Sequence, residues 1–161
     1  KEERKLPELS ESALFRQFVR ATCRATLFNM TPEELDNALD KLDDARALGE
    51  TNLRLLNLVS QRFKNDEYPS PVEKGIAIRA ILNEAFERML GTATRSDGDP
   101  ALQNYNVLYY RYFRYHMKNE QVAARVSVST RQYFRYRNKA LEELLTILLE
   151  MEKAATPDVD E

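Results

Sequence analysis

The sequence contains few residues that break helices, and almost none that form cross-links or metal sites. Only 4 glycines and 6 prolines occur among its 161 residues, and tryptophan is absent. Because Cys23 is the only cysteine, an internal disulfide and a cysteine-based zinc site are excluded. His116 is the only histidine, so it has no second imidazole with which to build a metal site or a catalytic pair. We therefore expect no metal, no cofactor and no enzymatic activity.

The sequence also lacks the motifs of common nucleotide-binding and hydrolytic sites. It contains no P-loop, no G-x-G-x-x-G, no G-x-S-x-G and no H-E-x-x-H. No apolar run approaches the roughly 20 residues needed to cross a bilayer, and no signal peptide is recognisable. These absences predict a cytoplasmic protein. Because the chain begins at Lys1 and not at Met, we expect it to have been trimmed or cut from a longer protein.

The residues that are abundant favour helices. Hydrophobic residues make up 43% of the chain and charged residues 31%, enough for an apolar core with charges of both signs outside it. With so few helix breakers, the apolar periodicity predicts an all-α protein of about seven helices. These helices are expected at about Ser10–Asn29, Met30–Ala47, Glu50–Asn65, Pro71–Leu90, Ala101–Met117, Glu120–Val126 and Thr130–Lys153.

The order of the helices predicts two parts. Residues 1–91 are expected to form a four-helix bundle that mediates dimerisation or binds a larger protein partner. Residues 92–100 contain Thr, Ser, Asp and Gly but no large apolar residue, so we interpret them as a linker loop. Residues 101–153 are expected to form a helix-turn-helix unit with a long last helix. Residues 154–161 are expected to be a frayed acidic tail.

Basic residues are concentrated in the second part. Residues 101–139 contain eight basic residues and one acid, Glu120, so this segment carries a net charge of +7 while the rest of the chain carries −9. A basic segment in an otherwise acidic protein is the electrostatic footprint of a module that binds a polyanion. The alternative is a solvated basic face without a ligand.

The segment that follows residue 118 has the pattern of a helix-turn-helix. It offers an N-cap for each helix, a small residue where the helices cross, and apolar residues for their interface and turn: Asn119, Ser129, Ala123, Val122, Val126 and Val128. Most such turns have Gly where this chain has Ser127, so we expect Ser127 to adopt a strained conformation that costs about 1 kcal/mol relative to Gly. Tyr133 and Tyr136 are expected to point into the core.

The opposite face of the last helix carries the candidate DNA contacts. Thr130, Arg131, Phe134 and Arg135 recur at helical spacing, with Asn138 next on the same stripe, and we predict that the first four contact bases. Arginine can bind guanine with two hydrogen bonds, and Thr or Phe can contact the thymine methyl group. Predicted phosphate contacts are Arg111, Arg114, Lys118, Arg125, Ser129, Arg137 and Lys139.

Three segments carry a resemblance to known regulators: Glu120–Ala123 (EQVA), Val128–Arg131 (VSTR) and Lys139–Leu144 (KALEEL). They resemble region 4 of sigma-70-type factors and are similar to ArpU-like phage transcription regulators, whose final helix ends in a Lys-Ala-Leu-x-x-Leu pattern. Ser129–Tyr136 (STRQYFRY) is also similar to a helix-turn-helix found ahead of signalling ATPase or repeat domains in some bacterial regulators. The resemblance covers about Val107–Leu148.

The resemblance implies a bacterial or phage transcription regulator that binds double-stranded DNA. It places the base-contacting positions at Thr130, Arg131, Phe134 and Arg135. No counterpart of sigma region 2 is recognisable, so a complete sigma factor is not expected.

Two other functions are compatible with the sequence. The first is a helical protein–protein adaptor, or the N-terminal module of a larger ATPase regulator, in which the helix-turn-helix is only structural. The second is a binder of single strands or RNA, because seven of the eight tyrosines lie between positions 105 and 136, close to basic residues. We favour a simpler interpretation of the helix expected at Ala101–Met117. In it, the helix packs into the core through Leu108, Tyr109, Tyr112, Phe113 and His116.

The acidic residues between positions 33 and 44 have neither the spacing nor the glycine of a calcium-binding loop. We interpret them as a solvated helix face.

Overall fold

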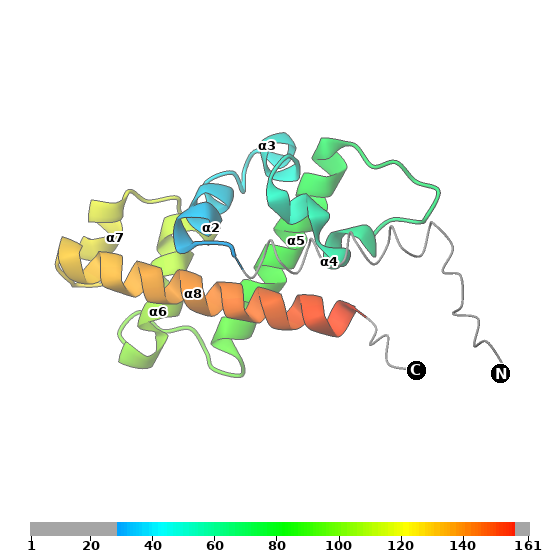
Figure 1. The fold of residues 1–161 in the computed structure, drawn as a ribbon. Coiled ribbons are helices and arrows are strands. Elements are labelled where there is room, and N and C mark those ends of the chain that lie inside the picture. Colours follow the sequence, from blue (N-terminus) through cyan, green and yellow to red (C-terminus); the bar gives the residue numbers. More distant parts are fainter. Residues whose placement is uncertain (1–28, 157–161) are drawn as a thin grey trace, which may run out of the picture.

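The computed structural model describes residues 29–156, and this part is entirely helical (Figure 1). Within it lie seven α-helices, three short 3-10 or π segments and no strand. The α-helices are α2 (Pro32–Leu39), α3 (Ala45–Gly49), α4 (Asn57–Ser60), α5 (Pro71–Leu90), α6 (Gln103–Leu108), α7 (Asn119–Arg125) and α8 (Thr130–Ala155). The shorter segments are η1 (Asn52–Leu55), η2 (Pro100–Leu102) and the π-helix η3 (Tyr109–Phe113). The predicted all-α class with a long final helix is confirmed.

Local sequence signals set the start of the two longest helices. At α5, the Ser70 side chain accepts a hydrogen bond from the Glu73 backbone N–H, the Glu73 carboxylate accepts one from the Ser70 N–H, and Pro71 is the first helical residue. The same reciprocal cap joins Ser129 and Gln132 at α8. Both starts agree with the sequence prediction, because each cap lies within four residues and needs no tertiary contact.

Three other predicted helices are wrong in extent. The helix predicted for Ala101–Met117 consists of η2, α6 and the π-helix η3, and it ends at Phe113. The helix predicted for Met30–Ala47 ends at Leu39, and a turn leads to α3, whose first amides are capped by Asp44. The helix predicted for Glu50–Asn65 is replaced by η1 and α4. The expected helix at Ser10–Asn29 lies, apart from Asn29, outside the described residues.

Helix α4 is capped at its N-terminus by a side chain from the other end of the described part of the chain. Both oxygens of the Glu152 carboxylate accept hydrogen bonds from its first amides, at 2.7 Å from Asn57 N and 3.1 Å from Leu58 N. Glu152 is fully buried, so these bonds replace the water that its charge would otherwise need. The predicted fraying from Ala154 onward is therefore wrong as far as Thr156, which is buried and whose hydroxyl donates to the Glu152 carbonyl oxygen.

Helix α8 runs along the length of the described part (Figure 1). Its first turns pack beside α7, its middle contacts α2, α5 and α6, and its last turns reach α4. The side of α8 that faces these helices is apolar, with Leu141, Leu144 and Leu148 fully buried. They belong to one core together with residues of α2 and α5. The described residues before and after the loop at 91–99 thus share an apolar core.

The closest helix contact joins α3 to α5, where two glycines let the backbones touch. A Cβ atom on Gly75 would lie 1.6 Å from the carbonyl oxygen of Ala45, and one on Gly49 would lie 1.7 Å from that of Pro71. Both distances are far inside van der Waals contact, so this crossing requires residues without a side chain. Within residues 29–156, no helix is both long enough and apolar enough to cross a membrane.

We expect Gly75→Ala to lower the free energy of unfolding by about 1–3 kcal/mol, the usual cost of an extra methyl in a packed contact. This change opposes the intrinsic preference, since Ala favours a helix interior by about 1 kcal/mol over Gly. Urea unfolding followed by circular dichroism measures it. Gly98→Ala is the control, because no atom lies within 4 Å of its added Cβ. Equal stability of Gly75→Ala and Gly98→Ala would contradict the close backbone contact between α3 and α5.

Candidate nucleic-acid interface

A second, smaller core holds α7 against the start of α8. It contains six buried residues: Val107, Tyr110, Val122, Ala123, Val126 and Tyr133. Val122, Val126 and Tyr133 are among the residues that the sequence predicted to face inward, and all three are buried, whereas Tyr136, also predicted to face inward, is only partly buried. Val128 and Tyr136 pack partly against the same cluster. The two helices therefore have a fixed relative position, which a surface made by both of them requires.

The N-terminus of α7 differs from the prediction. Asn119 is the first helical residue and Lys118 is the N-cap, whose backbone N–H donates to the Gln121 side chain at 3.0 Å. The Asn119 side chain instead joins two neighbouring segments. Its Oδ1 accepts hydrogen bonds from the Tyr133 hydroxyl at 2.6 Å and from Arg111 Nε at 3.1 Å. The predicted cap is thus a tertiary cross-link between η3, α7 and α8.

The turn between α7 and α8 is a Schellman motif with Ser127 in the left-handed region. The Val128 N–H donates to the carbonyl oxygen of Ala123 at 3.0 Å, and the Ser127 N–H donates to that of Ala124 at 3.2 Å. Ser127 has a φ of 60°, where a side chain is disfavoured, as the sequence predicted. The two hydrogen bonds and the packing of Val128 hold the turn in this conformation.

The four predicted base-contacting residues lie together on one exposed face. Thr130, Arg131 and Arg135 are exposed, and Phe134 keeps 37% of its surface accessible. They occupy the first two turns of α8, at the end of the molecule where α7 lies (Figure 1). Within residues 29–156, no carboxylate is within ion-pair distance of either arginine. This face therefore presents two cations and one aromatic ring to solvent.

The seven predicted phosphate contacts fall into two groups. In the first, three arginines are paired with acids: Arg111 with Asp40 at 2.9 Å, Arg137 with Asp36 at 3.4 Å and Arg125 with Asp97 at 3.6 Å. In the second are Arg114, Lys118, Ser129 and Lys139, which are exposed. Among the described residues, none of the three cations in this second group has an ion-pair partner. The second group is the better placed to reach phosphate.

The pair of Asp36 and Arg137 is mostly enclosed between α2, η3 and α8. Their side chains are 18% and 14% exposed, and the Tyr112 hydroxyl donates a hydrogen bond to Asp36. Burial, followed by the hydrogen bond to Asp36, raises the pKa of Tyr112 well above its usual value. Tyr112 consequently stays a hydrogen-bond donor to Asp36 at every physiological pH.

The acids around α2 are therefore not simply a solvated face, which corrects our interpretation of the sequence. Asp36 and Asp40 bind arginines of the C-terminal helices, and Asp43 lies 2.9 Å from His116 Nε2. A signal was present in the sequence, because positions 36, 40 and 43 are spaced four and three apart as on one helical face. Their basic partners lie at least 70 residues further along the chain, so the sequence did not show the pairing.

The segment predicted as a linker, residues 92–100, is fastened to the C-terminal helices. The Asp97 carboxylate accepts hydrogen bonds from the Tyr110 hydroxyl and from Arg95. These bonds hold the pKa of Asp97 below its usual value, with the bond from Tyr110 the largest cause. The Arg95 guanidinium stacks 4.2 Å from the centre of the Tyr109 ring. These contacts could not be predicted from the sequence because the segment contains no apolar anchor.

The tyrosine-rich segment packs largely as a core, as favoured above. Leu108 and Tyr112 are buried as predicted, and Tyr109 and Phe113 pack against the core while partly buried. Tyr105 and Tyr110, which were not predicted to face the core, are buried too. His116 was predicted to face the core, and that prediction is wrong. Its side chain is 43% exposed and its φ is 50°, because the chain turns outward after η3. Few aromatic faces are therefore left for stacking on a single strand.

Comparison of the chain with protein-family models, with curated proteins and with solved structures found no significant match. The resemblance to sigma-70 region 4 and to ArpU-like regulators therefore stays a prediction. Within residues 29–156, no group of three or more His, Cys, Asp or Glu side chains is arranged to hold a metal ion.

We expect Ser127→Gly to raise the free energy of unfolding by about 1 kcal/mol, because Gly adopts a positive φ without the steric cost that Ser pays. Thermal and urea unfolding measure the change. Ser127→Ala is the matched control, since it removes the hydroxyl but keeps the Cβ, and it should not be stabilised. If Ala stabilised the protein as much as Gly, the backbone at this turn would not be the cause.

A second prediction concerns the pH dependence of stability. Burial raises the pKa of Tyr133 to about 12. Since this value exceeds the unfolded value near 10, the stabilisation from the neutral phenol is complete below pH ~10 and is lost as pH rises through about 12. Tyr133→Phe should cost about 1 kcal/mol at pH 7, where it removes the hydrogen bond to Asn119. That deficit should shrink by about 1 kcal/mol between pH 9 and pH 11.

Urea unfolding of the native protein and of the variant at pH 7, 9 and 11 gives this difference. Tyr68→Phe is the control, because Tyr68 is 98% exposed and the change removes a phenol hydroxyl that folding does not bury. A deficit for Tyr133→Phe that stayed constant or grew with pH would contradict the buried neutral phenol.

Proposed function

We propose that the protein binds double-stranded DNA at specific sequences and acts in transcription regulation, with the first two turns of α8 in the major groove. The observation that carries the proposal is the exposed stripe of Thr130, Arg131, Phe134 and Arg135, which has no ion pair among the described residues. The major groove is about 12 Å wide and admits one α-helix. A helix that enters it must expose base-contacting groups at its N-terminal end.

The rigidity of this end of α8 supports the proposal. The reciprocal cap of Ser129 and Gln132 fixes the first turn, and the Schellman turn before it fixes the entry angle. Tyr133 anchors the opposite side of the helix through its hydrogen bond to Asn119. Base-contacting side chains on a rigid helix lose less conformational entropy on binding than side chains on a mobile loop.

We further propose that Arg114, Lys118 and Lys139 contact the DNA backbone. They flank the stripe in sequence on both sides and are exposed. Arg111, Arg125 and Arg137 are already paired with carboxylates, so a phosphate would have to displace an acid from each of them. The phosphate contacts that we propose are therefore fewer than the seven that the sequence suggested.

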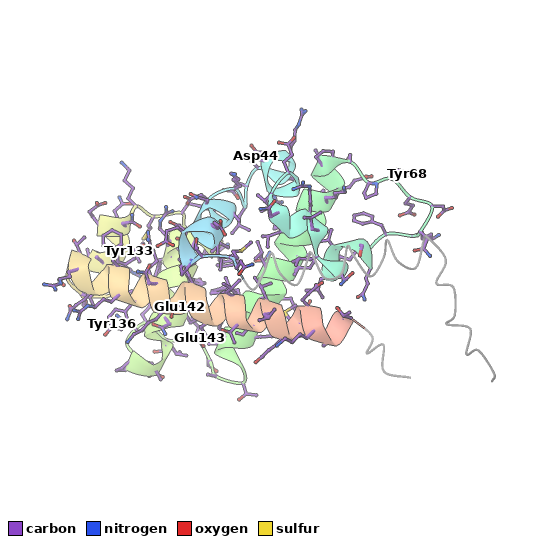
Figure 2. The ribbon with its side chains drawn as sticks, viewed as in Figure 1. Asp44, Tyr68, Tyr133, Tyr136, Glu142 and Glu143 are labelled. Atoms are coloured by element: carbon purple, nitrogen blue, oxygen red, sulfur yellow. The ribbon has the colours of Figure 1, made fainter. Side chains whose placement is uncertain are left out.

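A specific observation favours the adaptor as the second candidate. Tyr68, Val72 and Ile76 are large apolar side chains with 98%, 44% and 55% of their surface exposed. They lie on the loop before α5 and on its first turns, and Figure 2 places Tyr68 at the opposite end of the molecule from α7. Exposed apolar residues that gather in one region are typical of protein contacts. A partner or a second copy at this end is compatible with DNA at the other.

The test is duplex binding as a function of salt. A pool of random duplexes is selected with the native protein, and affinity for the selected duplex is measured from 50 to 200 mM salt. Three phosphate contacts predict a slope of roughly −3 in a plot of log affinity against log salt. The Arg131→Ala/Arg135→Ala variant should bind at least about 30-fold more weakly, because each base contact contributes about 1–3 kcal/mol.

The matched control is Arg46→Ala/Arg88→Ala, which removes the same charge from exposed arginines of α3 and α5. It should keep the affinity of the native protein within about twofold. If the native protein bound no duplex at 50 mM salt, the adaptor function would replace the proposal. Equal losses in the two double variants would mean that net charge, and not the α8 face, drives binding.

A further inference from the structure

Phe134 is the one apolar side chain on the exposed stripe of α8, and contacts from the core hold its ring. The Tyr133 ring meets it at 64° with 5.2 Å between the ring centres. The Arg137 guanidinium lies over the ring, 5.0 Å from its centre. The remaining 37% of the residue faces solvent on the same stripe as Arg131 and Arg135. An exposed aromatic ring that its neighbours hold in place is suited to contacting an apolar group of the ligand.

The position of the Arg137 side chain is in turn fixed by contacts inside the protein. Arg137 pairs with Asp36, and Asp36 accepts a hydrogen bond from the buried Tyr112. Arg137 Nε is buried and makes no hydrogen bond within the described residues, so the ion pair and the ring contact hold the guanidinium. The chain of contacts runs from α2 and η3 through α8 to the surface of the stripe. Each member restricts the position of the next.

The charge of Arg137 is already compensated. Its side chain is 14% exposed, and moving it to a phosphate would leave Asp36 unpaired at a position that is 18% exposed. Leaving a partly buried carboxylate without its partner is costly. Arg137 is therefore poorly suited to the phosphate contact that the sequence suggested, and well placed to hold Phe134.

We infer that Phe134 recognises the C5-methyl group of a thymine, and that Arg137 is a positioning residue for its ring. The inference rests on the proposed function, since it names what part of the DNA this face selects. Thymine is the only base whose major-groove edge carries an apolar group, and a phenyl ring offers no hydrogen bond to the other three bases. The neighbouring Arg131 and Arg135 then bind the bases on either side of that thymine.

The experiment replaces thymine by deoxyuridine, which lacks only the methyl group. The selected duplex is resynthesised with one replacement at a time, and each duplex is titrated with the native protein. We expect one thymine at which the replacement weakens binding about fourfold, the contribution of one buried methyl. In Phe134→Ala this ratio should fall to about one. In Tyr68→Ala, which removes an exposed aromatic ring from the other end, it should stay at about four.

The role of Arg137 is tested by Arg137→Lys and Asp36→Asn. Arg137→Lys keeps the charge but removes the planar group over the ring, and Asp36→Asn removes the ion pair without changing α8. Both should reduce the thymine-to-deoxyuridine ratio and leave the salt slope unchanged. Arg137→Ala is measured as well. If Arg137 contacted a phosphate, this variant would have a salt slope smaller by about one and an unchanged thymine-to-deoxyuridine ratio. Circular dichroism establishes which variants are folded, and either folded variant suffices for the test.

Two outcomes would overturn the inference while the proposed function stands. In one, the native protein binds its selected duplex but no deoxyuridine replacement changes the affinity. In the other, the discriminating thymine is found but its ratio survives in Phe134→Ala. Absence of any duplex binding contradicts the proposed function itself, and is distinguishable because it appears before any replacement is made.

Discussion

Burial of one face of α8 is the constraint on which the rest of the structure depends. Leu141, Leu144 and Leu148 are fully buried in the main core, and Tyr133 is fully buried in the smaller one. Each such side chain contributes roughly 1.5–3 kcal/mol to the free energy of folding. Because all four lie on one rigid helix, the rotation of α8 about its axis is determined over its whole length. The exposed direction of Arg131, Phe134 and Arg135 follows from that rotation, so the core that buries the C-terminal half of α8 also orients its N-terminal face.

The acids that surround the C-terminal helices restrict where a polyanion can bind. Asp40 and Asp97 hold Arg111 and Arg125 by ion pairs that are partly open to solvent, and such pairs add little to stability. Their larger effect is on the field around the protein. Each pair removes one cation from sequence-independent attraction to phosphate, while the arginines on the α8 stripe stay unpaired among the described residues. In the proposed complex with DNA, a surface of this kind would weight binding toward base contacts over backbone contacts, which favours specificity over affinity.

The sequence predicted those features whose causes lie within a few neighbouring residues. The start of α5 follows from Ser70 with Glu73, the start of α8 follows from Ser129 with Gln132, and the strained turn follows from Ser127 in place of Gly. Features with distant causes were not predictable. Helix α4 is capped by Glu152 from 95 residues away, and the turn after α2 places Asp40 and Asp43 beside residues of η3 and the segment after it. Helical periodicity cannot show such pairings, because it describes one segment at a time.

In the same way, the sequence shows how many basic residues there are, but not which of them a ligand can reach. Residues 101–139 contain eight basic side chains, of which three are ion-paired with acids from α2, its following turn or the loop before η2. The five others are Arg114, Lys118, Arg131, Arg135 and Lys139. Two of these five lie on the exposed stripe with Phe134, and three lie beside it in sequence. The arginine that is most enclosed, Arg137, contacts the ring of Phe134. Folding thus turns a diffuse basic segment into a small set of accessible cations close to one exposed aromatic side chain, and the proposed DNA contact rests on this arrangement.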